Sequence, residues 1–186
     1  MDHGYFFLRF LPITTIFLGP TISTILIADL DGPVAMKALV LFESKYGNTE
    51  RIAQAISAGL REGGVESVEC RSQSVSGEED FLEKDLWVLG TTTHYGGVPF
   101  RFSVLLKNAL REDHTGVKAA VFDTRMKDFP KGAGAKMKKI LEKKGKEVIA
   151  DASFVVMGMR GPLEEGEEER ARLFGKGIAD SLARNR

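Results

Sequence analysis

Short apolar runs alternate with segments of helical periodicity from Met36 to the end of the chain. Each apolar run is bounded by turn-forming or charged residues, and between the runs apolar residues recur every three or four positions. This alternation is typical of βαβ units built around a parallel sheet. We therefore expect five strands, at residues 38–42, 65–70, 86–90, 119–123 and 148–157.

Four helices are expected between and after these strands. Residues 49–62 place Ile52, Ile56 and Leu60 on one stripe and are followed by two glycines that end the helix. The same spacing predicts helices over 100–110, 134–144 and 165–182. Residues 72–83 are polar and show no strong period, which predicts a loop with a short helix near residues 78–82.

The first 35 residues differ from the rest of the chain. Residues 5–30 are mostly apolar, contain Arg9 as their one basic residue and are interrupted by Pro12 and Pro20. The segment has the length of a membrane span, but it lacks the positive start and cleavage site of a secretory signal. Because Met36 opens a strand at once, we expect an over-extended gene start, with a membrane anchor through residues 5–30 as the alternative. Mass spectrometry of the native N-terminus separates the two.

Residues 36–186 are predicted to form one domain, because their number supports a single hydrophobic core. The whole chain has 26 basic and 26 acidic residues, so no net charge favours binding to nucleic acid or to an anionic membrane. Cys70 is the only cysteine, which excludes an intramolecular disulfide and fits a reducing compartment. The expected location is cytoplasmic, and a membrane enters only if the apolar extension is real.

Candidate chemistry follows the first predicted strand. In an open parallel sheet, ligands bind outside the carboxyl ends of the strands, where the strand order reverses. The first such loop runs directly into a helix, whose exposed N–H groups and positive dipole end favour a phosphate. Gly47 lets the backbone fold around an anion, and Ser44 and Thr49 add hydroxyl donors. The candidate phosphate-binding residues are Ser44, Lys45, Tyr46, Gly47, Asn48 and Thr49.

Two further loops are expected at the same edge of the sheet. After the third strand, hydroxyls, an aromatic ring and glycines are packed together, which suits a planar ring stacked on Tyr95. His94 is a candidate hydrogen-bond donor to that ring or a solvated loop residue. After the fourth strand, Thr124 and Arg125 are weaker candidates for the far side of the site. The candidates of the second loop are Thr91, Thr92, Thr93, His94, Tyr95, Gly96 and Gly97.

Together the three loops resemble those of the flavodoxin-like FMN-binding family, over essentially all of residues 36–186. Ser44, Gly47 and Thr49 match the family's phosphate loop, whereas Tyr46 resembles the form found in its quinone reductase branch. Thr93-His94-Tyr95-Gly96 is similar to the flavin-ring loop of that branch. The resemblance implies an α/β fold, a flavodoxin-like three-layer sandwich of the short-chain form. It also implies a five-stranded parallel sheet in the order 2-1-3-4-5 and FMN as cofactor.

The resemblance leaves several functions open. The leading hypothesis is an FMN-binding protein in electron transfer or oxidoreduction, with a redox partner protein or a small-molecule electron acceptor. Residues 36–186 carry 25 basic and 23 acidic residues, unlike the strongly acidic electron shuttles of the family. The alternatives are an NAD(P)H:quinone-type or protoporphyrinogen-type FMN oxidoreductase. A non-redox receiver-like domain is a minor alternative, because Gly90 stands where such a domain needs an aspartate.

Overall fold

The computed structural model describes residues 35–93, 97–129 and 132–184. It contains a five-stranded parallel sheet in the order β2-β1-β3-β4-β5, as the resemblance implied. The strands are β1 (Lys37–Glu43), β2 (Ser67–Ser72), β3 (Leu86–Thr92), β4 (Lys118–Met126) and β5 (Glu147–Val156). The helices are α1 (Asn48–Glu62), α2 (Phe100–Ala109), α3 (Ala133–Lys143) and α4 (Glu167–Arg184), with short 3₁₀ turns η1 (Gln73–Val75) and η2 (Glu78–Phe81).

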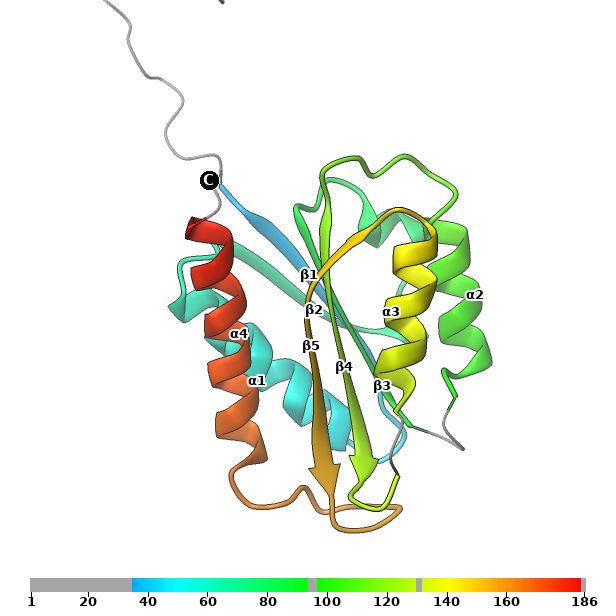
Figure 1. The fold of residues 1–186 in the computed structure, drawn as a ribbon, viewed down its shortest axis with the longest axis vertical. Coiled ribbons are helices and arrows are strands. Elements are labelled where there is room, and N and C mark those ends of the chain that lie inside the picture. The colour runs from blue at the N-terminus through cyan, green and yellow to red at the C-terminus, as the bar shows by residue number, and fades with distance from the viewer. Residues whose placement is uncertain (1–34, 94–96, 130–131, 185–186) are drawn as a thin grey trace, which may run out of the picture. The chain divides into compact units, whose positions relative to one another are not determined.

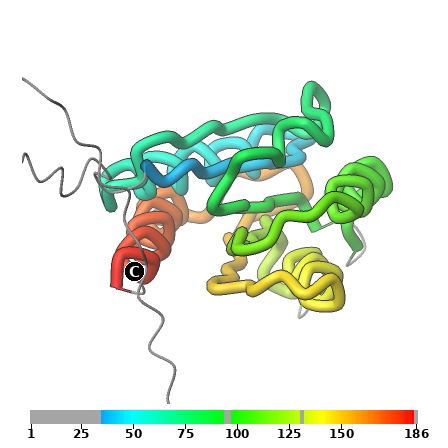
Figure 2. Tube along the Cα trace, turned by 90° about the horizontal axis from the view of Figure 1, so that it is seen from above, coloured from blue at the N-terminus to red at the C-terminus, as the bar shows by residue number. Residues whose placement is uncertain are grey.

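The described residues form three layers. Helices α1 and α4 cover one face of the sheet, and α2 and α3 cover the other (Figures 1 and 2). The strands alternate between the two faces, so that Val40 and Phe42 of β1 belong to one core while Leu39 and Leu41 belong to the other. Burial on both faces is why the strands read as continuous apolar runs in the sequence. None of the helices in the described part of the chain is long and apolar enough to cross a membrane.

Strands β1, β3 and β4 are longer than their apolar runs predicted, and β2 lies at 67–72 rather than at 65–70. We expected β3 to end at residue 90 and β4 at residue 123, but they continue to Thr92 and Met126. Thr92 pairs with Thr124, and Arg125 pairs with Val155 of β5. Backbone hydrogen bonds to the neighbouring strands therefore keep these polar residues in strand conformation. The prediction that Thr124 and Arg125 lie in a loop was therefore wrong, and the third loop begins after Met126.

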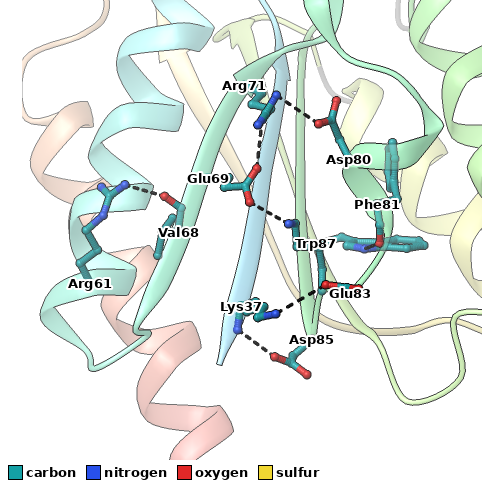
Figure 3. Close-up of polar contacts among 11 residues, drawn as sticks. Lys37, Arg61, Val68, Glu69, Arg71, Asp80, Phe81, Glu83, Asp85 and Trp87 are labelled. Atoms are coloured by element: carbon teal, nitrogen blue, oxygen red, sulfur yellow. Dashed lines mark hydrogen bonds and ion pairs between the residues drawn. The ribbon is translucent and has the colours of Figure 1, made fainter. Parts of the chain in front are cut away.

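The connection between β2 and β3 crosses the sheet without a long helix, as its polar composition predicted. Phe81 of η2 is fully buried and packs edge-on against Trp87, with ring centroids 5.0 Å apart. A polar network fastens this connection to the edge strand β2 (Figure 3). In it, Glu69 accepts hydrogen bonds from Lys84 and Arg71 at 2.8 and 3.0 Å, and Arg71 also pairs with Asp80 at 3.2 Å.

This network predicts an acid-sensitive contribution to stability. The hydrogen bond from Lys84 lowers the pKa of Glu69 below its ordinary value of 4.5, and Arg71 adds to the effect. A carboxyl with a depressed folded-state pKa stabilises the fold above pH 4.5 and loses that contribution as the pH falls through its folded pKa. Urea unfolding of Glu69→Gln should therefore show a smaller loss of stability below pH 4.5 than the parent chain. The exposed Glu66→Gln variant is the control and should keep the parent's pH dependence.

Candidate functional site

The loop between β1 and α1 has the backbone geometry of an anion site. Gly47 precedes α1 with φ 82°, a left-handed conformation that L-amino acids with side chains rarely adopt. Having no side chain, Gly47 leaves the first N–H groups of α1 without a side-chain cap. These N–H groups and the helix dipole favour a negatively charged ligand at this end of α1.

The Ser44 hydroxyl supplies the second property of an anion site. Its Oγ is buried and has no hydrogen-bond partner among the described residues. Leaving a buried hydroxyl unpaired costs about 1–3 kcal/mol, so such groups are rare in folded proteins. A ligand oxygen at this position would satisfy the hydroxyl. The residues present therefore fit a phosphate group, which is the anionic end of FMN.

Three threonines join this loop to the two strands beside it. Thr49 is buried, and its Oγ1 lies 2.9 Å from Oγ1 of Thr92 on β3 and 2.8 Å from Oγ1 of Thr124 on β4. Three residues predicted to bind the cofactor therefore form hydrogen bonds to one another through their hydroxyl groups. Their contacts fix the start of α1 against the carboxyl ends of β3 and β4.

Thr91 and Thr93 are also bonded within the protein. Thr91 is fully buried and donates from Oγ1 to Glu43 at 3.1 Å. Thr93 accepts at Oγ1 from the backbone N–H of Ala133 at 2.9 Å, so it caps the first turn of α3. The backbone N–H of Thr93 donates to the Thr124 carbonyl at 2.9 Å. These bonds hold the second loop in register with the start of α3.

A segment that sequence reasoning did not single out reaches the phosphate loop from the far edge of the sheet. Asn48 donates from Nδ2 to the carbonyl of Arg160, in the turn that follows β5, at 3.1 Å. Gly161 has φ 97°, which other residues rarely adopt, and a Cβ there would come within 2.6 Å of the Asn48 side chain and displace it. Tyr46 is 38% exposed, with the cations of Lys45 and Arg160 at 5.4 and 5.9 Å from its ring centroid.

The remaining residues predicted for the cofactor site are not part of the threonine cluster. His94, Tyr95 and Gly96 lie outside the described residues, and Gly97 is half-buried at the end of that gap. The Arg125 side chain is not brought to the threonine cluster. Its Nη1 donates to the Phe129 carbonyl at 2.8 Å, and its Nε lies 3.9 Å from Oδ1 of Asp123. Asp123 and Arg125 lie on the face of the sheet that α3 covers, whereas Thr124 lies on the face that α1 covers.

Comparison with known proteins identifies similar chains. The flavodoxin family model matches residues 40–174. A flavodoxin from Clostridium saccharobutylicum is 24% identical over 157 residues, covering 79% of this chain and 98% of the relative. Probable flavodoxin 2 from Bacillus subtilis (strain 168) is 29% identical over 148 residues, covering 77% and 94%. The solved structure of a flavodoxin from the domain Archaea superposes with a TM-score of 0.66 at 19% identity, covering 80% and 99%. The chain therefore belongs to the flavodoxin family, whose members bind FMN and transfer electrons.

Proposed function

We propose that this protein is an electron carrier that holds the phosphate of FMN in the loop from Ser44 to Thr49. The observation that carries the proposal is the buried, unpartnered hydroxyl of Ser44 beside the uncapped N-terminus of α1. Both features stabilise a bound phosphate, by a charge-assisted hydrogen bond and by the helix dipole. Neither feature contributes favourably to the protein without a ligand.

When bound, FMN supplies the redox chemistry, and the chain supplies binding, orientation and local charge. In this proposal, Ser44 and the first N–H groups of α1 bind the phosphate. The hydroxyls of Thr49, Thr92 and Thr124 hold the phosphate loop against the strands rather than binding the ligand themselves. Residues 91–97, with Tyr95, line the ring and the ribityl chain.

The third loop offers a further aromatic residue. Phe129 follows β4 and is 38% exposed. Its backbone is fixed, because its N–H donates to the Met126 carbonyl at 3.1 Å and its carbonyl accepts from Arg125. We include Phe129 among the ring-contact residues of the proposal, in the loop where the sequence offered only Thr124 and Arg125.

An NAD(P)H:quinone-type FMN oxidoreductase is the second candidate. Tyr46 favours it, because its loop resembles that branch and its partly exposed ring has two cations at 5.4 and 5.9 Å from its centroid. Steady-state assays of the FMN-loaded chain with NAD(P)H and a quinone test this candidate. Turnover would identify an enzyme, and an absence of turnover together with rapid oxidation of the reduced protein by an external acceptor would identify a carrier.

The decisive experiment for the cofactor site is reconstitution. The purified chain should show a flavin absorption spectrum, and the flavin released on denaturation should be FMN. Titration of the flavin-free protein should give tighter binding of FMN than of riboflavin, because only FMN reaches the phosphate loop. Equal affinity for the two ligands would contradict the proposed role of residues 44–49.

A further inference from the structure

A polar pocket lies between β4, β5 and the first turn of α3. It has a volume of about 180 Å³ and is lined by Asp123 and Arg125 of β4, by Asp151 and Ser153 of β5, and by small residues at the start of α3. One ordered water needs roughly 10–15 Å³ on this measure, so the pocket accommodates a small organic group. It is separate from the proposed phosphate site. Thr124, which bonds to Thr49 at that site, lies on the opposite face of β4.

The register of the sheet places these polar side chains together. Asp123 pairs with Ser153, and Val121 pairs with Asp151 on the neighbouring strand. Asp123 and Arg125, like Asp151 and Ser153, are two positions apart and therefore share a face of their strand. The same face is apolar nearer the start of β4, where Val121 is fully buried. The polar group is thus confined to the carboxyl end of the sheet beneath α3.

Asp123 is the central group of the pocket. Its side chain is 1% exposed, and its Oδ2 accepts a hydrogen bond from the backbone N–H of Gly134 at 2.8 Å. Its Oδ1 is buried and has no hydrogen-bond partner among the described residues. The nearby Nε of Arg125 is 3.9 Å away, which is an ion-pair distance but too long for a hydrogen bond. A buried carboxylate oxygen in this condition requires an N–H or O–H donor.

The other charged groups around the pocket have partners. Asp151 accepts from Lys138 at 2.7 Å, and Arg125 donates to the Phe129 carbonyl. The charges of Asp123 and Asp151 are balanced by the cations of Arg125 and Lys138, so the unpartnered oxygen of Asp123, rather than a net charge, selects the ligand. No cluster of three or more metal-ligating side chains occurs in the described ranges, so a bound metal ion is not indicated. A small organic group with several N–H donors matches this set of acceptors.

We infer that this pocket binds a small molecule through a primary ammonium group, which donates to Oδ1 of Asp123. The three N–H donors of such a group also match the second carboxylate, Asp151, and the hydroxyl of Ser153 as neighbouring acceptors. Gly132, just before α3, and Gly134, in its first turn, leave Ala135 to supply the side chain on this wall of the pocket. This site does not depend on the flavin.

The test uses ethylammonium chloride as the probe and the ¹⁵N-labelled, FMN-loaded full chain. Ethylammonium should shift the backbone amide resonances of Gly134 and Ser153 in a saturable manner at constant ionic strength. Tetramethylammonium has the same charge but no N–H donor, and it should leave both resonances unchanged. Shifts of equal size with both cations, or no saturable shift with ethylammonium, would overturn the inference.

Asp123→Asn tests the residue itself. The amide oxygen of asparagine keeps the bond from Gly134, while its NH₂ group replaces the acceptor Oδ1 with a donor. Ethylammonium should then bind roughly ten- to a hundredfold more weakly. The exposed Asp180→Asn, on α4, is the matched control and should bind ethylammonium as the parent does. Unchanged affinity in Asp123→Asn would also overturn the inference.

Two further measurements keep these results interpretable. If Asp123→Asn does not fold, Ser153→Ala is measured in its place and should weaken ethylammonium binding severalfold, whereas unchanged binding contradicts the site. The FMN affinity of each variant is measured in parallel and should stay at the parent value. Loss of FMN binding in either variant would contradict the independence of this pocket from the flavin site, whereas equal affinity of the parent for FMN and riboflavin would contradict the flavin site alone.

Discussion

Replacing Ser44 with alanine should weaken FMN binding by roughly ten- to a hundredfold while leaving riboflavin binding nearly unchanged. The reason is that a hydrogen bond to a charged group is worth about 1.5–3 kcal/mol, and only FMN carries the phosphate. Stability of the flavin-free protein should not fall, because the Oγ that is removed has no partner among the described residues. Quenching of flavin fluorescence measures the two affinities, and urea unfolding measures the stability.

Thr49→Val is the informative comparison for that variant. Its hydroxyl is already bonded to Thr92 and Thr124 inside the protein, and valine keeps nearly the same shape. This variant should lower the free energy of unfolding of the flavin-free protein by about 1–2 kcal/mol, which Ser44→Ala should not do. If Ser44→Ala weakened FMN and riboflavin equally, the phosphate would have to bind elsewhere.

Replacing Gly175 with alanine should destabilise the protein by about 1–3 kcal/mol. Gly175 lies where α4 packs against α1, and a Cβ there would be 2.2 Å from the carbonyl oxygen of Ile56. That neighbour is backbone, so it cannot move aside as the end of a flexible side chain would. Because α1 begins at the phosphate loop, a displaced α1 should also weaken FMN binding. Urea unfolding with and without FMN measures both effects.

Gly177→Ala, two residues further along the same helix, is the matched control. A Cβ at Gly177 meets nothing within 4 Å, so the substitution adds no clash. It should stabilise the protein by about 0.5–1 kcal/mol, because alanine has the higher helix propensity. Opposite signs for the two variants are the expected result. A similar small gain in stability at both positions would show that α1 and α4 are packed less closely than described.

The order and type of the elements were predictable because they depend on local patterns. Apolar runs with turn residues at both ends indicated each strand, and the stripe of Ile52, Ile56 and Leu60 indicated α1. The lengths of β3 and β4 were less predictable. Their last residues are polar and are held in strand conformation by pairing with neighbouring strands, which leaves no mark on local hydrophobicity.

In the candidate site, too, local features were predictable from the sequence and long-range contacts were not. The loop that we propose for the phosphate could be located in the sequence, because Gly47 and the start of α1 are adjacent and form a local structural unit. The contact between Asn48 and the turn at Arg160 was not, because 112 residues separate the two partners. A glycine at position 161 can indicate a close contact in the folded protein, but the sequence alone does not show that the contact is with Asn48.

The sequence by itself determined the alternating α/β order, and it predicts a single domain from Met36 onward and a phosphate-binding loop after the first strand. Only the tertiary structure decided which hydroxyls are free. It joins Thr49 to Thr124, 75 residues away, and leaves Ser44 and one oxygen of Asp123 without partners among the described residues. The physical reason is that local periodicity follows from neighbouring residues, whereas hydrogen-bond partners are assigned only when distant strands and helices pack together.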